Sequence, residues 1–198
     1  MTITPIEHGL DLAISRAYRS PGLHMSDIYN RFYQDSEPKR FKKGVAPDPL
    51  HLEMGLSMEA VMEEGLKRRL AERPGEFTTP EGVIFSPDLL IYNHVLRVGE
   101  IKLTWMSERE VVEAWGTEPG AIKTFATVPQ KFRKWFTQLM NYNHALGTPY
   151  ARLYSAFVNG NYKGSGPTLR AWDIEFTQRE LDEEHDMLFR YARREGML

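Results

Sequence analysis

The sequence contains no cysteine, which excludes disulfide bridges, thiolate zinc sites, iron–sulfur clusters and a cysteine nucleophile. It has no Gly-rich phosphate loop of the Walker type, so intrinsic ATP-driven activity is not supported. It also has no apolar run long enough to span a bilayer and no signal peptide at its start, and we expect a cytoplasmic protein without membrane contact. A net charge of −2 excludes a globally basic nucleic-acid binder, so any such contact must come from local basic patches.

The chain does have enough apolar material for one folded domain over residues 1–198. Hydrophobic residues make up 41% of it and aromatic residues 12%, which is typical of a globular protein. Its patterns divide it into a loop-rich N-terminal extension over 1–53, a core over 54–160, and a C-terminal strand and helix over 161–198.

The most informative pattern is a predicted β-hairpin. Residues 82–91 and 96–105 are rich in β-branched and apolar side chains and are separated by a short polar turn signal. Glu100 and Lys102 are two positions apart, so they point to the same face of the second strand. Asp88 can lie opposite them on the first strand. Two carboxylates and one amine are therefore expected to converge in an otherwise apolar sheet.

Such a cluster suits metal-dependent phosphoryl chemistry. Carboxylates hold Mg²⁺ or Mn²⁺, and the metal lowers the pKa of a bound water and stabilises charge on a phosphoryl group. Lys102 can orient or deprotonate the attacking water and offset phosphate charge. The alternative is a salt bridge on a solvated hairpin. Similar short patterns occur at Glu37-Pro38-Lys39 and Pro47-Asp48, but they lie in a charged, proline-rich stretch without strand pattern. The predicted strands therefore favour the hairpin residues as the site.

Two long helices are predicted around this hairpin. The first, over 54–72, carries Glu59 and Glu63, which are four apart and therefore neighbours on one face. They lie near the apolar stripe, which is unusual for carboxylates, although exposed flanking positions are the alternative. The second helix runs from about Pro129 to Ala145. Cations in its first turn oppose the helix dipole, so either a phosphate backbone or simple solubility accounts for Lys131, Arg133 and Lys134.

The remaining pattern predicts short helices at Ser26–Gln34 and Glu108–Trp115, strands at Tyr150–Asn159 and Leu169–Phe176, and a final helix from a capping box at Thr177 to about Arg194. This order of helices and strands predicts an α/β or α+β fold with one layered sheet between helices.

Two further motifs flank the hairpin. Gln138 and Tyr142 form a Gln-x-x-x-Tyr motif on the helix that follows it. On the preceding helix, Gly55 and Glu63 match the ends of a Gly-x-x-x-His-x-x-x-Glu motif, with Glu59 in place of histidine. Together these residues resemble the PD-(D/E)xK nuclease superfamily, in the branch of phage λ-type exonucleases, RecB nuclease domains and Cas4-type proteins. The resemblance implies a restriction-endonuclease-like core with a central mixed β-sheet in αβββαβ order.

The resemblance also implies roles for the residues. Mg²⁺ or Mn²⁺ would be held by two carboxylates, a backbone carbonyl and a helix carboxylate, supplied by Asp88, Glu100, Ile101 and Glu63. Glu59 competes with Glu63 for the last role, and its place in the motif suggests a carboxylate-only site. Lys102 would be the catalytic lysine. Gln138 and Tyr142 would position substrate or hold the lysine, although Tyr142 can also be read as a core aromatic.

The implied activity is a Mg²⁺- or Mn²⁺-dependent deoxyribonuclease that hydrolyses phosphodiester bonds. A phage-type exonuclease of recombination, replication or DNA degradation is the first interpretation, in the host cytoplasm if it is phage-encoded. The partner would be DNA, with Lys131, Arg133 and Lys134 on its backbone, together with a possible homo-oligomer or a recombination or replication protein. The alternatives are an endonuclease of the same superfamily and a catalytically inactive nucleic-acid-binding protein on the same fold.

Overall fold

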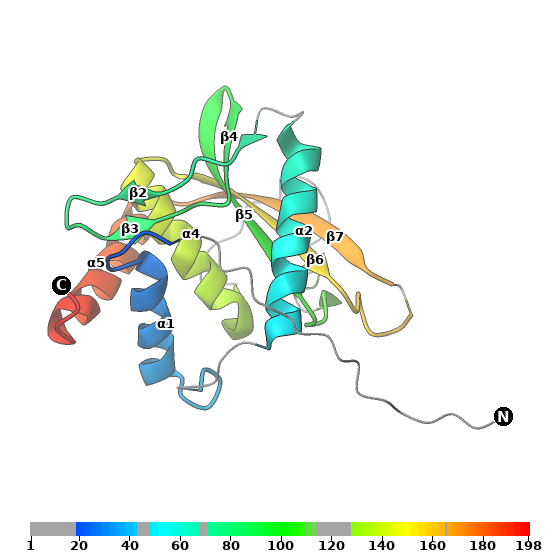
Figure 1. Ribbon diagram of the computed structural model, residues 1–198, viewed down its shortest axis with the longest axis horizontal. Coiled ribbons are helices and arrows are strands. Elements are labelled where there is room, and N and C mark those ends of the chain that lie inside the picture. The colour runs from blue at the N-terminus through cyan, green and yellow to red at the C-terminus, as the bar shows by residue number, and fades with distance from the viewer. Residues whose placement is uncertain are drawn as a thin grey trace.

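The computed structural model describes residues 19–42, 48–67, 71–109, 111, 113, 128–164 and 166–198 (Figure 1). The elements are α1 (Met25–Ser36), α2 (Pro49–Lys67), β1 (Ala71–Glu72), β2 (Phe77–Thr78), β3 (Ile84–Phe85), β4 (Leu89–Asn93), β5 (Val95–Thr104), the 3₁₀ turn η2 (Gln130–Phe132), α4 (Arg133–Leu146), β6 (Tyr150–Phe157), β7 (Thr168–Glu175) and α5 (Gln178–Arg194). Among the described helices, none is both long and apolar enough to cross a bilayer.

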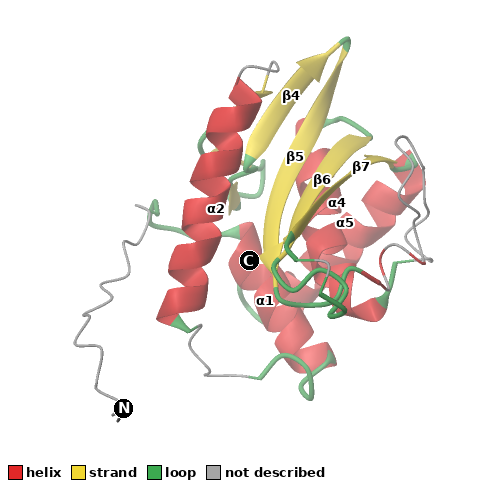
Figure 2. Cartoon of the chain, turned by 90° about the vertical axis from the view of Figure 1, so that its right-hand side faces the viewer, coloured by secondary structure: helices red, strands yellow, loops and turns green. Residues whose placement is uncertain are grey.

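A five-stranded sheet forms the middle of three layers. Its strand order is β1-β4-β5-β6-β7, with β5 and β6 parallel and the other neighbours antiparallel. Figure 2 shows α2 on one face of the sheet and α1, α4 and α5 on the other. This confirms the expected mixed sheet flanked by helices. From α2 to β6, apart from the short β2–β3 pair, the order is the predicted helix, three strands, helix and strand.

The predicted hairpin is present, but its first strand is shorter than expected. β4 pairs with β5 from Leu89↔Gly99 to Asn93↔Val95, and His94 turns the chain with a positive φ of 61°. Residues 84–85, which were expected to belong to this strand, instead pair with β2 in a separate two-stranded sheet. Pro87 lies at the break, and it has no backbone N–H to donate to a ladder. The break leaves Asp88 just outside the sheet hydrogen bonding of β4.

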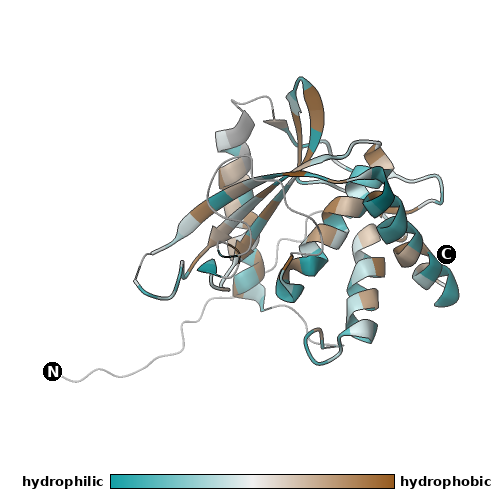
Figure 3. Cartoon of the chain, turned by 180° about the vertical axis from the view of Figure 1, so that it is seen from behind, coloured by the Kyte–Doolittle hydropathy of each residue, from teal (hydrophilic) through white to brown (hydrophobic). Residues whose placement is uncertain are grey.

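Alternation along β5 gives the sheet two apolar faces. Val98 belongs to the large core under α1, α4 and α5, whereas Ile101 belongs to a smaller core under α2. The smaller core contains few residues because it is covered by one helix only. In Figure 3 hydrophilic and hydrophobic residues alternate along the helices, as expected for amphipathic helices packed on a core. Charged residues within β5 therefore have to be accommodated between two apolar layers.

Most other element boundaries follow the predictions, but residues 71–72, which were predicted to end the helix over 54–72, form the strand β1. β6 and β7 agree with the predicted strands to within two residues, and Thr177 caps α5 with Glu180 in a capping box. α2 starts at Pro49 and not near residue 54, because Asp48 accepts a hydrogen bond from the N–H of Leu50 at 2.9 Å and caps the first turn. The helix predicted at Glu108–Trp115 lies largely outside the described residues.

Candidate active site

Asp88, Glu100 and Lys102 come together at the end of the β4–β5 hairpin. Continuing the register beyond Leu89↔Gly99 places Asp88 beside Glu100. Asp88 Oδ2 accepts a hydrogen bond of 2.7 Å from the N–H of Ile101, which fixes the carboxylate against β5. Glu100 is fully buried, and its carboxylate forms an ion pair with the ammonium of Lys102. The predicted convergence of two carboxylates and one amine is therefore present in the structure.

Gln138 of α4 connects this cluster to the helical layer. Its Nε2 donates to Glu100 Oε1 at 2.7 Å, and its Oε1 accepts from Lys102 Nζ at 3.1 Å. Nε2 also lies 3.3 Å from the hydroxyl of Tyr142, one turn further along α4. Gln138 is thus fixed from both sides of its amide. Both donors to Glu100 use the same oxygen, so Glu100 Oε2 is buried without a hydrogen-bond partner.

The electrostatics of the cluster are dominated by burial. Desolvation, followed by the charge of Asp88, raises the pKa of Glu100 from 4.5 to about 8. Desolvation also raises the pKa of Asp88, although Lys102 and the Ile101 N–H oppose this. Burial alone would lower the pKa of Lys102, but Glu100 and Asp88 outweigh it and raise that pKa above its ordinary value. The lysine is therefore held protonated, and Glu100 keeps its proton to a higher pH than an ordinary carboxyl, because burial and a second negative charge beside Asp88 are unfavourable.

The donor set fits a small divalent cation. The unpartnered Glu100 Oε2 lies in a site with a second carboxylate, and a cation would compensate both. In an extended strand the N–H and C=O of one residue point to the same edge, so the carbonyl of Ile101 faces the edge where its N–H meets Asp88. Among the described residues, no three His, Asp or Glu side chains form a metal-sized cluster. Mg²⁺ keeps several waters, so two carboxylates and a carbonyl are sufficient.

Of the two candidate helix carboxylates, Glu59 is the one whose side chain the structure describes. It lines a cleft between α2 and β5 together with Ile101 and Lys102, and it contributes to the raised pKa of Glu100. Its Oε1 lies 3.5 Å from a guanidinium nitrogen of Arg73, which keeps it on this side of α2. The side chain of Glu63 lies outside the described part of the chain. The structure therefore places the competitor at the site, and the assignment of Glu63 stays a prediction.

Tyr29 is a site residue that the sequence patterns did not indicate. It is buried on α1, and Lys102, Glu100 and Asp88 all influence its pKa, which burial raises above the ordinary value. It falls within the short helix predicted at Ser26–Gln34, but it was not assigned to the apolar stripe of that helix. Its proximity to Lys102 depends on the packing of α1 against α4, which no local pattern encodes.

The basic residues of the η2–α4 segment do not all share one surface. Lys131 and Lys134 line a cavity of about 390 Å³ that is also bordered by Lys102 and Gln138. Arg133 is exposed and is not among the residues that line this cavity; its charge acts on Tyr33 and Glu184 instead. The structure thus brings two of the three predicted phosphate contacts to the site.

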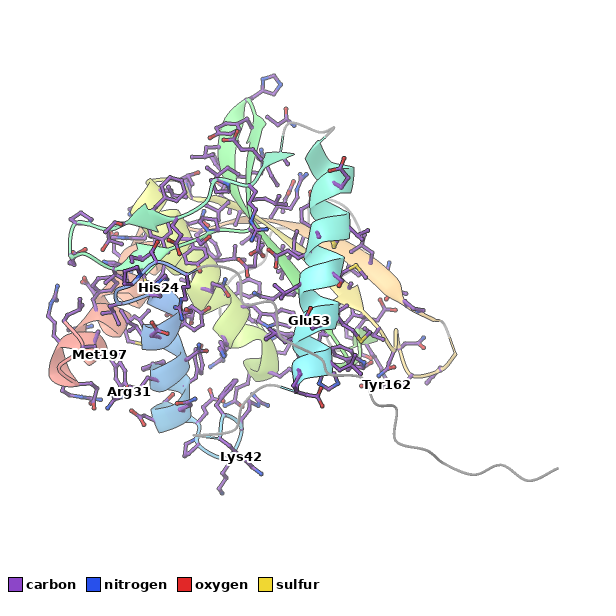
Figure 4. All side chains as sticks on the ribbon, in the orientation of Figure 1. His24, Arg31, Lys42, Glu53, Tyr162 and Met197 are labelled. Atoms are coloured by element: carbon purple, nitrogen blue, oxygen red, sulfur yellow. The ribbon has the colours of Figure 1, made fainter. Side chains whose placement is uncertain are left out.

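A second cavity, of about 380 Å³, reaches Tyr142 but is not lined by Asp88, Glu100 or Lys102. It is lined by Tyr142 and Ser86 from the site region and by Arg19, Ser26 and Arg73. It adjoins the beginning of α1, where His24 is the N-cap (Figure 4). Arg19 donates to Ser26 Oγ at 2.6 Å, which leaves the serine hydroxyl proton available for another acceptor.

Comparisons with known proteins give no family assignment. No protein-family model and no curated protein matches the chain. Among solved structures, it is similar to the alkaline exonuclease LHK-Exo from Laribacter hongkongensis, with a TM-score of 0.48 and 12% identity over 88% of this chain and 89% of that one. For the complex of LHK-Exo with dAMP, the TM-score is 0.47 and the identity 13%, with the same coverage. For the protein SSO0001, the TM-score is 0.46 and the identity 15%, over 88% of this chain and 79% of that one. At these TM-scores the similarities carry no functional argument.

Proposed function

We propose that this protein is a divalent-metal-dependent deoxyribonuclease and that it hydrolyses phosphodiester bonds at the Asp88–Glu100–Lys102 cluster. The observation that carries the proposal is the buried pair of carboxylates with an unpartnered oxygen on Glu100, next to a protonated lysine. An isolated structural salt bridge would not need the second carboxylate, whose repulsion destabilises the cluster. A bound cation offsets this repulsion.

In this proposal, Asp88, Glu100 and the carbonyl of Ile101 hold Mg²⁺ or Mn²⁺, which supplies a water of lowered pKa and stabilises charge on the phosphoryl oxygens. Lys102 has a raised pKa, so it acts as a cationic donor to a phosphate oxygen or to the attacking water and not as a general base. Gln138 holds the ammonium and Glu100 Oε1 in fixed positions. Tyr142 in turn supports the amide of Gln138.

An exonuclease is the form of the activity that the surroundings favour. The second cavity is lined by Arg19, Arg73 and Ser26 beside Tyr142. Arg19 is also paired with Asp27 and Arg73 with Glu59, so a phosphate there would share these cations with carboxylates. Cationic and hydroxyl donors of this kind suit a phosphate at the end of a strand. In an endonuclease, DNA would have to continue past the site on both sides. We therefore place a strand end in this cavity.

The decisive experiment incubates purified protein with linear, nicked and covalently closed circular DNA in Mg²⁺, Mn²⁺, Ca²⁺ or EDTA. We expect degradation of linear DNA in Mg²⁺ or Mn²⁺, little turnover in Ca²⁺ and none in EDTA. Loss of closed circles at the rate of linear DNA would identify an endonuclease. Binding without cleavage in every metal would identify an inactive nucleic-acid-binding protein, and undiminished cleavage in excess EDTA would rule out the mechanism.

A further inference from the structure

The cavity bordered by Lys102, Gln138, Lys131 and Lys134 has an unusual lining. Besides these residues it includes Arg40 and three aromatic side chains, Tyr29, Phe41 and Trp135, and none of its described lining residues is a carboxylate. Its volume of about 390 Å³ falls in the range of about 300–1,000 Å³ that is usual for small organic ligands. We refer to it as the aromatic cavity. It differs from the second cavity, whose lining includes the carboxylate Glu76. Each cavity has one paired arginine, Arg19 with Asp27 in the second cavity and Arg40 with Glu37 in the aromatic cavity.

Lys134 gives the aromatic cavity an uncompensated positive charge. Its ammonium lies 5.7 Å from the ring centroid of Tyr29 and 5.3 Å from that of Phe41, and it forms no ion pair with any described residue. Burial and the charge of Lys102 lower its pKa. A half-buried cation without a carboxylate gains most from an anionic ligand, and a phosphodiester supplies that charge without competing for the carboxylates of β5.

The aromatic rings of the cavity are held in place by neighbouring rings. Trp135 is half-buried and packs against Phe132 with a centroid distance of 4.8 Å, while Phe41 packs against Tyr33 at 5.3 Å. Ordered aromatic faces beside cations form the usual platform for single-stranded nucleic acids, because a base can stack on the ring while the phosphate meets the cation. A base that is paired inside a duplex cannot stack in this way.

We propose that the aromatic cavity binds one unpaired nucleotide of a DNA strand next to the phosphate that Lys102 contacts, with its base on Trp135 and its phosphate at Lys131 and Lys134. This inference rests on the proposed nuclease function and adds its substrate class, a strand that is single-stranded at the site. A duplex end must then be opened locally before its strand reaches Lys102. Trp135 is a binding residue in this arrangement and has no part in the chemical step.

The test measures the affinity of the full chain by fluorescence anisotropy in Ca²⁺, with a gel that verifies intact DNA. The probes are a short labelled single strand, a blunt duplex of the same sequence, and single strands with one abasic residue at successive positions from each end. Trp135→Ala should weaken single-strand binding about 5- to 100-fold, whereas Trp135→Phe should retain most of the affinity. Duplex binding should change by less than about threefold. Tyr92→Ala removes an aromatic ring that is 46% exposed on β4 and serves as the matched control without effect.

Combining an abasic residue in the DNA with Trp135→Ala in the protein tests whether a base stacks on Trp135. At one abasic position, the loss caused by the missing base and the loss caused by Trp135→Ala should not add, because each removes the same stack. Additive losses at every position, or equal losses for single strand and duplex, would overturn the subsite. Cleavage in Mg²⁺ with additive losses would leave the nuclease intact and remove the subsite. If single-strand binding depends on Trp135 but no metal supports cleavage, the result would support the subsite and overturn the proposed function.

Discussion

The two sides of Lys102 differ in charge and in burial. On the strand side, Asp88 and Glu100 are carboxyl groups fixed by β5, and Glu100 is fully buried. On the helix side, Lys131 and Lys134 are cations on the first turns of a helical segment, half-buried and open to a cavity. Lys102 and Gln138 connect the two sides through their hydrogen bonds. In the proposed nuclease, the desolvated strand side would carry the reaction and the solvated helix side would bind the DNA strand.

Removing the charge on the strand side should have the largest effect. Asp88→Asn and Glu100→Gln should each lower turnover by at least about a thousandfold, because several kcal/mol of charge stabilisation is lost with the metal. The fold should remain, since neutralising one carboxylate relieves the repulsion between the two. Initial cleavage rates at saturating DNA and thermal melting measure the two effects.

Asp48→Asn is the matched control for these variants. Asp48 belongs to the other Pro-Asp pair of the sequence and caps α2, and asparagine preserves a cap. Its activity and stability should equal those of the wild type. If Asp88→Asn or Glu100→Gln behaves like this control, the strand side does not perform the chemistry and the assignment of the metal ligands is wrong.

Gln138 tests whether the two sides must be connected. Gln138→Leu removes both hydrogen bonds that align Lys102 and Glu100 Oε1, and we expect turnover to fall about 10- to 100-fold with little change in DNA affinity. Tyr142→Phe removes only the more distant contact at 3.3 Å and should have a smaller effect. A larger effect of Tyr142→Phe than of Gln138→Leu would show that the tyrosine acts on DNA directly.

The strand side was more accessible to sequence analysis than the helix side. Asp88, Glu100 and Lys102 are brought together by one hairpin, so alternation and a turn signal were enough to predict their convergence. The Gln-x-x-x-Tyr motif likewise placed Gln138 on the correct helix. The strand boundary was less predictable, because Pro87 ends the hydrogen-bonded pairing although the apolar pattern continues through it.

The aromatic cavity depends on contacts between distant segments. Tyr29 comes from α1, Phe41 from the turn after it and Trp135 from α4, and only the packing of α1 against α4 unites them. The local sequence around each ring does not indicate that the three rings line one cavity. The separation of Arg133 from Lys131 and Lys134 has the same origin, since the three cations are adjacent in sequence but the helical turn directs them to different surroundings.

In the metal-free protein, the raised pKa of Glu100 on the strand side should make the stability depend on pH. Folding raises the pKa of Glu100 from 4.5 to about 8, so between these values the folded state binds a proton that the unfolded state has released. This stabilisation is complete below about pH 4.5 and is lost as the pH rises towards 8.

Glu100→Gln should therefore be more stable than the wild type at pH 8 by roughly 1–3 kcal/mol, with a smaller difference at pH 5. Urea unfolding in EDTA across this range measures the two curves. Mg²⁺ should stabilise the wild type more at pH 8 than at pH 5 and should have little effect on the variant. Parallel curves for the two proteins would mean that Glu100 keeps an ordinary pKa.

The helix side should give the smallest change in turnover and a defined change in salt dependence. Lys131→Gln with Lys134→Gln should reduce the slope of log affinity against log salt by about 1.4 for single-stranded DNA, because two phosphate contacts no longer release counterions. Cleavage at saturating DNA should fall much less than affinity, since neither side chain belongs to the carboxylate cluster. Arg133→Gln is the matched single neutralisation, and it should leave the slope nearly unchanged because Arg133 does not line the aromatic cavity. Affinity titrations at several salt concentrations decide the comparison. An unchanged slope in the double variant, or an equal decrease in Arg133→Gln, would show that charge on this helical segment is only a solvated surface and that DNA reaches Lys102 from another direction.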